Sequence, residues 1–338
     1  MFRARRIASE SAKILYPKKA MKKQCIKKLI EKFGMRSSFS IIKIKEAIYS
    51  ACVFLVIITP LGNCADIFLP AGGNILKIDS NKNISVFAST AGYTPSGVAF
   101  DTQGNLYAKA DNSILKIDAN GNVSVFAQNS ILGGSGALAF DSVGNLYAGN
   151  SDFKSVAKIT SGGIVSLYAT NASFSTAMTG LAFDKQNNLY VSTWENDKII
   201  KITPGGVYST FYQWSTTYTP SGIAIDKNDN LYVNSWENRL IGKIDQAGNY
   251  SVLASGSQIY GPYGMAIDSE GKIFSANYPF QAGNTITETL PDGTLTTYAS
   301  GVGGTGGGLW YLAVPEPSAL SLLAVGLGVV LRRCRRTV

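Results

Sequence analysis

Apolar and polar residues alternate in short runs that recur along the chain about every forty residues. The clearest run ends in an aspartate and is followed by a polar turn and a second apolar run, as in GLAFDKQNNLYVS over 180–192. The aspartates that mark five such units are spaced by 40, 43, 42 and 42 residues and are Asp101, Asp141, Asp184, Asp226 and Asp268. A period of this size, carried by short strands, predicts an array of blades and not a string of independent domains.

Each unit contains four short segments with strand character. In the third unit they cover 180–184, 188–192, 198–202 and 207–212, and the turn signals DKQNN and TPGG lie between the first and second and between the third and fourth. Four antiparallel strands in about forty residues predict one propeller blade.

The two ends of the repeat region predict how the ring closes. Residues 66–69, 75–78 and 84–88 have the patterns of a second, third and fourth strand without a first, and 307–313 supply a first strand without the rest. The predicted fold is therefore all-β, a six-bladed β-propeller over 66–313. One C-terminal strand completes a blade with three N-terminal strands, which removes the open edges of the ring. The fifth unit departs from the pattern because its third strand reads TITETL.

The repeats resemble those of the NHL-repeat and related six-bladed propeller families over about 66–313. The resemblance implies that ligands are taken up at the channel mouth, on the face formed by the loops between second and third strands and between successive blades. Gluconolactonase-like propellers hold one divalent ion with a Glu/Asn/Asn/Asp set. Streptogramin-lyase-like propellers, which the repeats also resemble, rely on histidine, and this chain has none.

Composition narrows the classes of function. The net charge of +9 belongs to the ends, because residues 65–313 hold 13 Lys/Arg and 18 Asp/Glu. A mildly acidic body argues against nucleic acid as a partner. The absence of histidine excludes Ser-His-Asp triads and His-ligated metals, and the cysteines, all outside the repeats, exclude a disulfide framework in the body: Cys25, Cys52, Cys64 and Cys334.

The N-terminal 65 residues read as an extension with a secretory signal peptide. The apolar stretch 47–58 follows Lys43 and Lys45 and precedes small residues, which favours cleavage after Ala65. Met35 offers an alternative start.

The C-terminal residues 314–338 carry the motif Pro315-Glu316-Pro317, an apolar segment over 318–331 and the basic residues Arg332, Arg333, Arg335 and Arg336. This order resembles the PEP-CTERM sorting signal of exported bacterial proteins. The resemblance implies transient association with the inner membrane, an exosortase-type processing enzyme as partner, and a body at the cell surface or outside the cell. A plain membrane anchor is the alternative. Fourteen residues span about 21 Å as a helix, short of the ~30 Å hydrocarbon core.

The repeated residues favour structural roles. An aspartate that opens a tight turn accepts hydrogen bonds from the following backbone, so we interpret the five aspartates as turn residues and not as a ring of calcium ligands. The LY tyrosines are expected to pack between blades, and the lysines of the third strands to face solvent.

Functional residues are expected where the repeat varies. Two WEN triplets, Trp194-Glu195-Asn196 and Trp236-Glu237-Asn238, occupy equivalent loops of adjacent units, and Tyr218 and Tyr260 lie on neighbouring loops. Aromatic rings with carboxylates and amides suit a carbohydrate or protein ligand. The alternative is a duplicated blade whose tryptophans pack on each other.

The preferred function is thus an exported, non-catalytic propeller that binds a ligand. A metal-dependent lactonase-like hydrolase is the alternative, since Glu195, Asn196, Glu237 and Asn238 offer oxygen ligands for calcium. No other cofactor is expected.

Overall fold

The computed structural model describes residues 66–170, 174, 180–278, 284–302 and 311–315. All described residues belong to one compact unit, 60–338. None of the described residues forms a helix long and apolar enough to cross a membrane. The predicted signal peptide and most of the predicted sorting signal lie outside the described residues.

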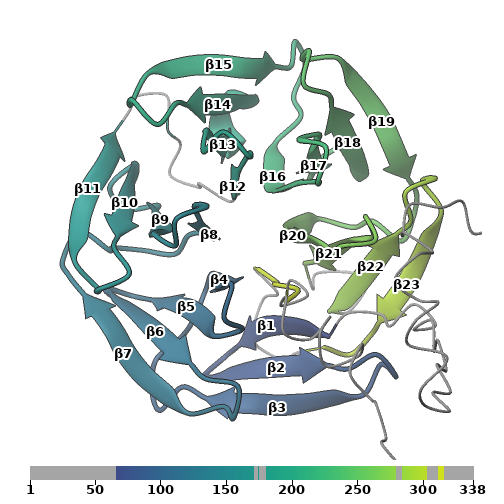
Figure 1. Ribbon diagram of the computed structural model, residues 1–338. Helices are drawn as coiled ribbons and strands as arrows, with labels where there is room; N and C mark the ends of the chain where they lie inside the picture. The colour runs from purple at the N-terminus through teal and green to yellow at the C-terminus, as the bar shows by residue number, and fades with distance from the viewer. Residues whose placement is uncertain (1–65, 171–173, 175–179, 279–283, 303–310, 316–338) are drawn as a thin grey trace, which may run out of the picture. The chain divides into compact units, whose positions relative to one another are not determined.

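Six antiparallel sheets surround a central channel and form a β-propeller (Figure 1). In each complete blade the four strands follow one another in sequence from the channel outward. We call the blades A to F in chain order. Blade A contains β1 (Ile67–Ala71), β2 (Asn74–Ile78) and β3 (Ile84–Ser89); blade B, β4 (Val98–Phe100), β5 (Leu106–Ala110), β6 (Ser113–Ile117) and β7 (Val123–Gln128); blade C, β8 (Leu138–Phe140), β9 (Leu146–Asn150), β10 (Ser155–Ile159) and β11 (Val165–Thr170). Blade D contains β12 (Leu181–Phe183), β13 (Leu189–Thr193), β14 (Lys198–Ile202) and β15 (Tyr208–Gln213); blade E, β16 (Pro220–Ile225), β17 (Leu231–Ser235), β18 (Leu240–Ile244) and β19 (Tyr250–Ser255); blade F, β20 (Pro262–Ile267), β21 (Ile273–Asn277), β22 (Thr285–Thr289) and β23 (Leu295–Ala299).

The ring closes between the two ends of the body. The N–H of Phe68 in β1 donates to the carbonyl of Ala313 at 2.9 Å, and the N–H of Ala313 donates back at 2.8 Å. Residues 311–313 thereby take the innermost position in blade A beside three N-terminal strands. The predicted six-bladed architecture and its closure are confirmed, although 307–310 lie outside the described residues. The irregular fifth unit also forms a complete blade, in which TITET is β22.

The repeated aspartates build the turns. Oδ1 of Asp101 accepts the backbone N–H groups of Gln103 and Asn105, and Oδ2 accepts the side-chain amide of Asn105 at 2.8 Å. The same pattern recurs after β8, β12 and β16, and it also closes several turns between third and fourth strands. Their interpretation as turn residues is confirmed. We call the end of the channel that carries these turns the turn face, and the opposite end the loop face.

The tyrosine of the LY pair joins neighbouring blades, as the sequence predicts. The ring of Tyr147 in β9 makes edge contacts with Tyr168 of its own blade and with Phe183 of blade D, at centroid distances of 4.8 Å. Its hydroxyl donates to Asp141 at 3.2 Å. Lys158 of β10 lies over the same ring at 5.5 Å, and equivalent lysines cover equivalent rings in blades A, B, D and E. These lysines are partly exposed to solvent, as expected, and each also covers an aromatic ring with its side chain.

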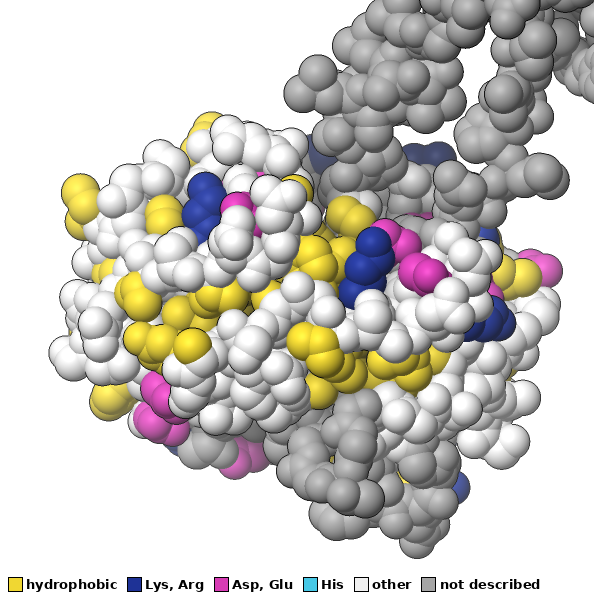
Figure 2. Space-filling model, turned by 90° about the horizontal axis from the view of Figure 1, so that it is seen from below, with side chains coloured by type: hydrophobic (Ala, Val, Ile, Leu, Met, Phe, Trp, Pro, Cys, Tyr) yellow, Lys and Arg dark blue, Asp and Glu magenta, His cyan; other side chains and the backbone are white. Residues whose placement is uncertain are grey.

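The outermost strands carry exposed apolar residues on the rim of the ring. Val86, Val125 and Leu167, at equivalent positions of β3, β7 and β11, are 60, 49 and 57% exposed. Seen from the side of blades A and B, hydrophobic side chains form a band across the ring (Figure 2). Each of these strands is bulged against its neighbour. A bulge increases local twist and makes an edge strand a poorer template for another strand.

Candidate functional site

The two WEN triplets lie next to each other on the loop face. Residues Trp194–Asn196 form a short 3-10 helix between β13 and β14, and Trp236-Glu237-Asn238 occupy the equivalent turn between β17 and β18. The two indole rings are in contact, with centroids 5.1 Å apart and planes at 55°. Both side chains are half-buried, so each keeps part of its ring accessible. The two tryptophans thus pack on each other, as the duplicated-blade alternative expects, and both also remain partly exposed.

The residue after each triplet holds the loop in place. Asp197 and Arg239 both adopt positive φ, 48° and 52°. Oδ1 of Asp197 accepts the backbone N–H groups of Tyr218 and Thr219 at 2.8 and 2.7 Å, which ties this loop to the start of blade E. The guanidinium of Arg239 lies 4.3 Å from the ring centre of Tyr260, at the start of blade F. The loops are therefore positioned by the following blade.

The tryptophans belong to a larger group that we call the aromatic cluster: Trp194, Trp236, Tyr263, Tyr278 and Tyr311. Trp194 contacts Tyr263 at 5.8 Å, Trp236 contacts Tyr278 at 5.4 Å, and Tyr263 contacts Tyr311 at 5.8 Å between ring centroids. The ring of Trp236 covers Gly261, where a Cβ atom would lie 3.1 Å from the indole. Gly261 also has φ +50°, a backbone conformation that favours glycine, so both the close indole and the backbone disfavour a larger residue there.

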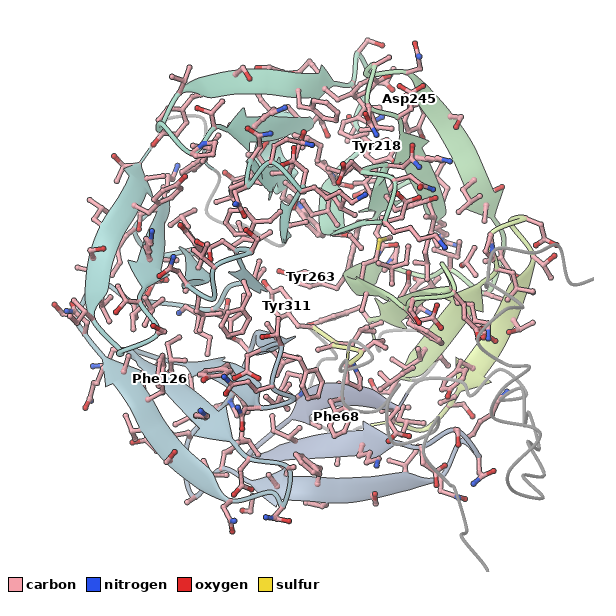
Figure 3. The ribbon with its side chains drawn as sticks, in the orientation of Figure 1. Phe68, Phe126, Tyr218, Asp245, Tyr263 and Tyr311 are labelled. Atoms are coloured by element: carbon pink, nitrogen blue, oxygen red, sulfur yellow. The ribbon has the colours of Figure 1, made fainter. Side chains whose placement is uncertain are left out.

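Tyr263 and Tyr311 extend the cluster from the loops to the channel. Both labels lie beside the open centre of the ring in Figure 3, on the innermost strands of blades F and A. Burial raises the pKa of both phenols above the ordinary value, so they remain neutral hydrogen-bonding groups at physiological pH. The cluster thus runs from blade D across blades E and F to the closing strand of blade A.

The sequence also distinguishes these two tyrosines, although they lie on inner strands and not on the variable loops. Tyr311 is two residues before the alanine that pairs with β1, and at that position four of the other blades have glycine and blade C has Ala137. Tyr263 stands where blades B and E have Ser96 and Ser221 and blade C has Gly136. Large aromatic residues therefore replace small ones on two adjacent inner strands.

Tyr218 does not lie on the rim as expected. Its side chain is only 3% exposed and stacks on Trp214 at 3.9 Å between centroids, with planes at 10°. Its hydroxyl lies 3.3 Å from that of Tyr250 and occupies space that a Cβ on Gly242 would fill. Burial, mainly, raises the pKa of Tyr218 well above its usual value. This residue belongs to the core between blades D and E, and we leave it out of the site.

The remaining predicted residues surround the tryptophans. Glu195 and Glu237 are exposed carboxylates on the two loops. The amide nitrogen of Asn238 donates to the carbonyl of Thr217 at 3.1 Å and to Oγ of Ser235 at 3.0 Å, and the carbonyl of Asn196 accepts from Gln213. Within the described part of the chain, no three His, Cys, Asp or Glu side chains are grouped so as to hold a metal ion. The arrangement offers aromatic surface flanked by two carboxylates.

The virginiamycin B lyase family matches residues 57–299, which is most of the chain. The chain belongs to this family. No curated protein sequence matches it significantly.

Solved structures share the fold of this family member at low sequence identity. A chain of the nidogen/laminin complex has a TM-score of 0.64 at 16% identity, covering 75% of this chain and 98% of that one. A streptogramin B lyase has a TM-score of 0.52 at 16% identity, with coverages of 70% and 74%. A catalytically inactive histidine-to-alanine variant of virginiamycin B lyase from Staphylococcus aureus, in complex with quinupristin, has a TM-score of 0.51 at 20% identity, with coverages of 61% and 69%. At such identities the likeness shows the fold alone.

Proposed function

We propose that this member of the virginiamycin B lyase family is an exported, non-catalytic propeller that binds a carbohydrate on its loop face. The observation that carries the proposal is the half-buried pair Trp194 and Trp236, held in contact at 5.1 Å and flanked by Glu195 and Glu237. Indole faces stack on the apolar faces of sugar rings, and carboxylates accept hydrogen bonds from sugar hydroxyls.

The rigidity of the site supports binding without further adjustment. Trp236 is fixed from below by Gly261 and at its side by Tyr278, and the neighbouring loop is fixed by the two hydrogen bonds to Asp197. Because these side chains are already ordered, binding of a ligand has a smaller entropic cost.

The chemistry present supports binding over lyase activity. A structural relative becomes catalytically inactive when one histidine is replaced by alanine. This chain has no histidine at any position. A general base of that type is therefore unavailable to it.

The export component rests on the sequence of the ends. We propose that a signal peptide within residues 1–65 directs secretion, and that the Pro-Glu-Pro motif at 315–317 with its apolar and basic tail directs processing by an exosortase-type enzyme. The mature body would then lie at the cell surface or in the extracellular matrix. Mass spectrometry of the protein recovered from the producing cells tests this: a C-terminus near the motif supports processing, and an intact C-terminus contradicts it.

Binding is tested on a glycan array that includes bacterial exopolysaccharides, followed by calorimetry with the oligosaccharides that bind. Trp194→Ala and Trp236→Ala together should abolish the signal. Phe153→Ala is the matched control, because Phe153 is a 54% exposed aromatic residue in the equivalent loop of blade C. Equal effects of the two changes, or no binding by the wild type, would remove the proposal.

A lactonase-like hydrolase remains the competing function and predicts different results. It requires calcium bound by the purified protein, loss of that calcium on Glu195→Gln or Glu237→Gln, and turnover of a panel of lactones. Any turnover that depends on these carboxylates would replace the binding proposal with the enzymatic one.

A further inference from the structure

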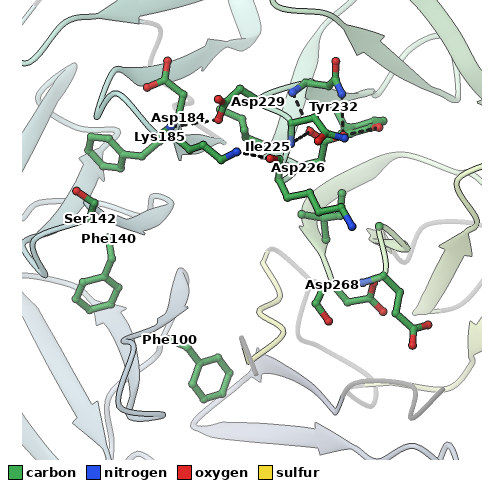
Figure 4. A pocket seen from close by; sticks show the side chains of 18 of the residues that line it. Phe100, Phe140, Ser142, Asp184, Lys185, Ile225, Asp226, Asp229, Tyr232 and Asp268 are labelled. Carbon is green, nitrogen blue, oxygen red and sulfur yellow. Dashed lines mark hydrogen bonds between the residues drawn. The ribbon is translucent and has the colours of Figure 1, made fainter. Parts of the chain in front are cut away.

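A cavity lies on the turn face, away from the aromatic cluster. It has a volume of about 730 Å³ and is lined by residues of blades B to F, none of which belongs to the aromatic cluster. Cavities of 300–1,000 Å³ are of the size that holds small organic ligands. Figure 4 shows Phe100, Phe140, Ile225 and Asp226 around the open centre of this cavity.

The floor of the cavity is apolar and partly aromatic. It is formed by the last residue of each inner strand, which is phenylalanine in blades B, C and D and isoleucine in blades E and F: Phe100, Phe140, Phe183, Ile225 and Ile267. All five side chains are half-buried, so each keeps some surface toward the cavity. Phe140 is held edge-on by Tyr107 at 5.2 Å, which fixes its ring.

The rim of the cavity is acidic. Each floor residue is followed by a turn aspartate, and altogether seven carboxylates and three lysines line the cavity, an excess of four negative charges. Burial acts to raise the pKa of Asp226, but hydrogen bonds from Asn230, Asn228 and Tyr232 outweigh it and hold that pKa below its usual range. Hydrogen bonds satisfy these oxygens without neutralising their charge.

The charges are unevenly placed around the rim. The three lysines, Lys185, Lys227 and Lys243, all come from blades D and E, and the Nζ of Lys185 donates to the carbonyl of Lys227. Blades B and C contribute Asp101 and Asp141 beside Phe100 and Phe140, with no basic side chain. Blade F contributes Asp268 and Glu270, and Glu270 is paired with Lys272 at 2.8 Å. Carboxylates without a lysine among the lining residues therefore lie on blades B, C and F, and in blades B and C they stand beside the aromatic part of the floor.

We propose that the turn-face cavity binds a small organic cation, an alkyl or aryl ammonium compound, with its charged end over Phe100 and Phe140. A cation placed there gains attraction from the ring faces and from the carboxylates of Asp101 and Asp141. The apolar part of the ligand covers the isoleucines of the opposite blades. A compound with the opposite charge is repelled by the same rim.

The test is calorimetry of the purified chain with three benzyl compounds of different charge. Benzyltrimethylammonium should bind more tightly than benzyl alcohol, and benzyl alcohol more tightly than phenylmethanesulfonate. Equal affinities for the three, or a preference for the sulfonate, would overturn the proposal.

Two sets of variants locate the site. Thr102 is exposed on the rim beside Asp101, so Thr102→Lys should weaken binding of the cation about threefold and Thr102→Glu should strengthen it by a similar factor. Thr216→Lys, an exposed position on the loop face, is the matched control and should change nothing. Phe140→Leu removes the ring but keeps an aliphatic floor like that of blades E and F, and should weaken binding about fivefold.

The aromatic cluster is itself able to attract cations, so it needs its own control. Trp194→Ala with Trp236→Ala should leave the affinity for benzyltrimethylammonium unchanged. If that double variant abolishes binding while the Thr102 pair has no effect, the cation binds on the loop face and the proposal is wrong. Carbohydrate binding by the same double variant tests only the proposed function of the loop face. The two proposals can therefore fail independently.

Discussion

Replacing Asp184 by alanine measures how much one turn of the repeat contributes to the stability of the ring. Asp184 is 8% exposed, and its two oxygens accept four hydrogen bonds. Oδ1 accepts the backbone N–H groups of Gln186 and Asn188 at 3.0 and 2.8 Å, and Oδ2 accepts the amide of Asn188 at 2.6 Å and the hydroxyl of Tyr190 at 3.2 Å.

The expected loss follows from the donors left behind. In Asp184→Ala the side chains of Asn188 and Tyr190, which are 9% and 6% exposed, lose an acceptor in a place that water reaches poorly. Each buried unsatisfied donor costs about 1–3 kcal/mol, so the free energy of unfolding should fall by about 4 kcal/mol. Part of the inter-blade packing of Tyr190 is lost with its hydroxyl bond.

Asp118→Ala is the matched control. Asp118 makes the same turn between β6 and β7, with bonds from Asn120 and Asn122 at 2.8 to 2.9 Å, but on the exposed outer side of the blade. Water replaces the lost acceptor there, so the loss should be less than half that of Asp184→Ala. Urea unfolding followed by tryptophan fluorescence measures both. Equal losses, or a change below about 1 kcal/mol for Asp184→Ala, would refute the assignment of the cost to buried donors. If EDTA destabilises the wild type but not Asp184→Ala, Asp184 is a metal ligand and not only a turn residue.

Three further predictions concern other parts of the ring. Burial of Lys109 in blade B lowers its pKa from 10.5 to about 8, although Nζ donates to carbonyls including that of Leu132 at 3.1 Å. The unfolded chain keeps this proton up to about pH 10.5, whereas the folded chain releases it above about pH 8. The free energy of unfolding of the wild type, measured relative to Lys109→Met, should therefore rise by about 3 kcal/mol in total over that pH window. A difference between the two proteins that stays constant from about pH 7 to 10 would contradict this. Gly136→Ala should lower the melting temperature far more than Gly144→Ala. A methyl group on Gly136 would overlap the carbonyl of Gly149. A methyl group on Gly144 would meet no atom, and only the φ of +85° at that position is unfavourable. A chain that ends at Val302 lacks Tyr311 and Ala313, so it should unfold at lower urea concentration than a chain that ends at Pro315; identical midpoints would show that the closing strand contributes nothing.

Much of the fold could be predicted because the repeat encodes local geometry. The predicted third strand of blade D, 198–202, is β14 as observed, and the aspartate at the end of each inner strand marks the turn that it builds. Closure of the ring could be predicted by counting strands. The N-terminal unit lacks a first strand, and the C-terminal end of the repeat region supplies one. These inferences need only neighbours in sequence or in the same blade.

The environment of loop residues could not be predicted in the same way. Tyr218 is buried because Gly242, more than twenty residues later in β18, leaves a space that its hydroxyl fills. Tyr263 and Tyr311 come together only because the C-terminal strand closes the ring beside blade F. The turn-face cavity could not be predicted for the opposite reason. Its floor residues and turn aspartates are regular members of the repeat, and only the closed ring brings them together around one cavity.

The direction of the closing strand separates the two proposed binding sites. Every inner strand runs from the loop face to the turn face, so the chain that enters blade A at Tyr311 leaves at Pro315 on the turn face. Asp66, at the start of β1, lies at the same end because Phe68 pairs with Ala313. Asp66 and Pro315 therefore both lie at the turn face, the end that carries the cavity, whereas Trp194 and Trp236 lie at the opposite end of the channel.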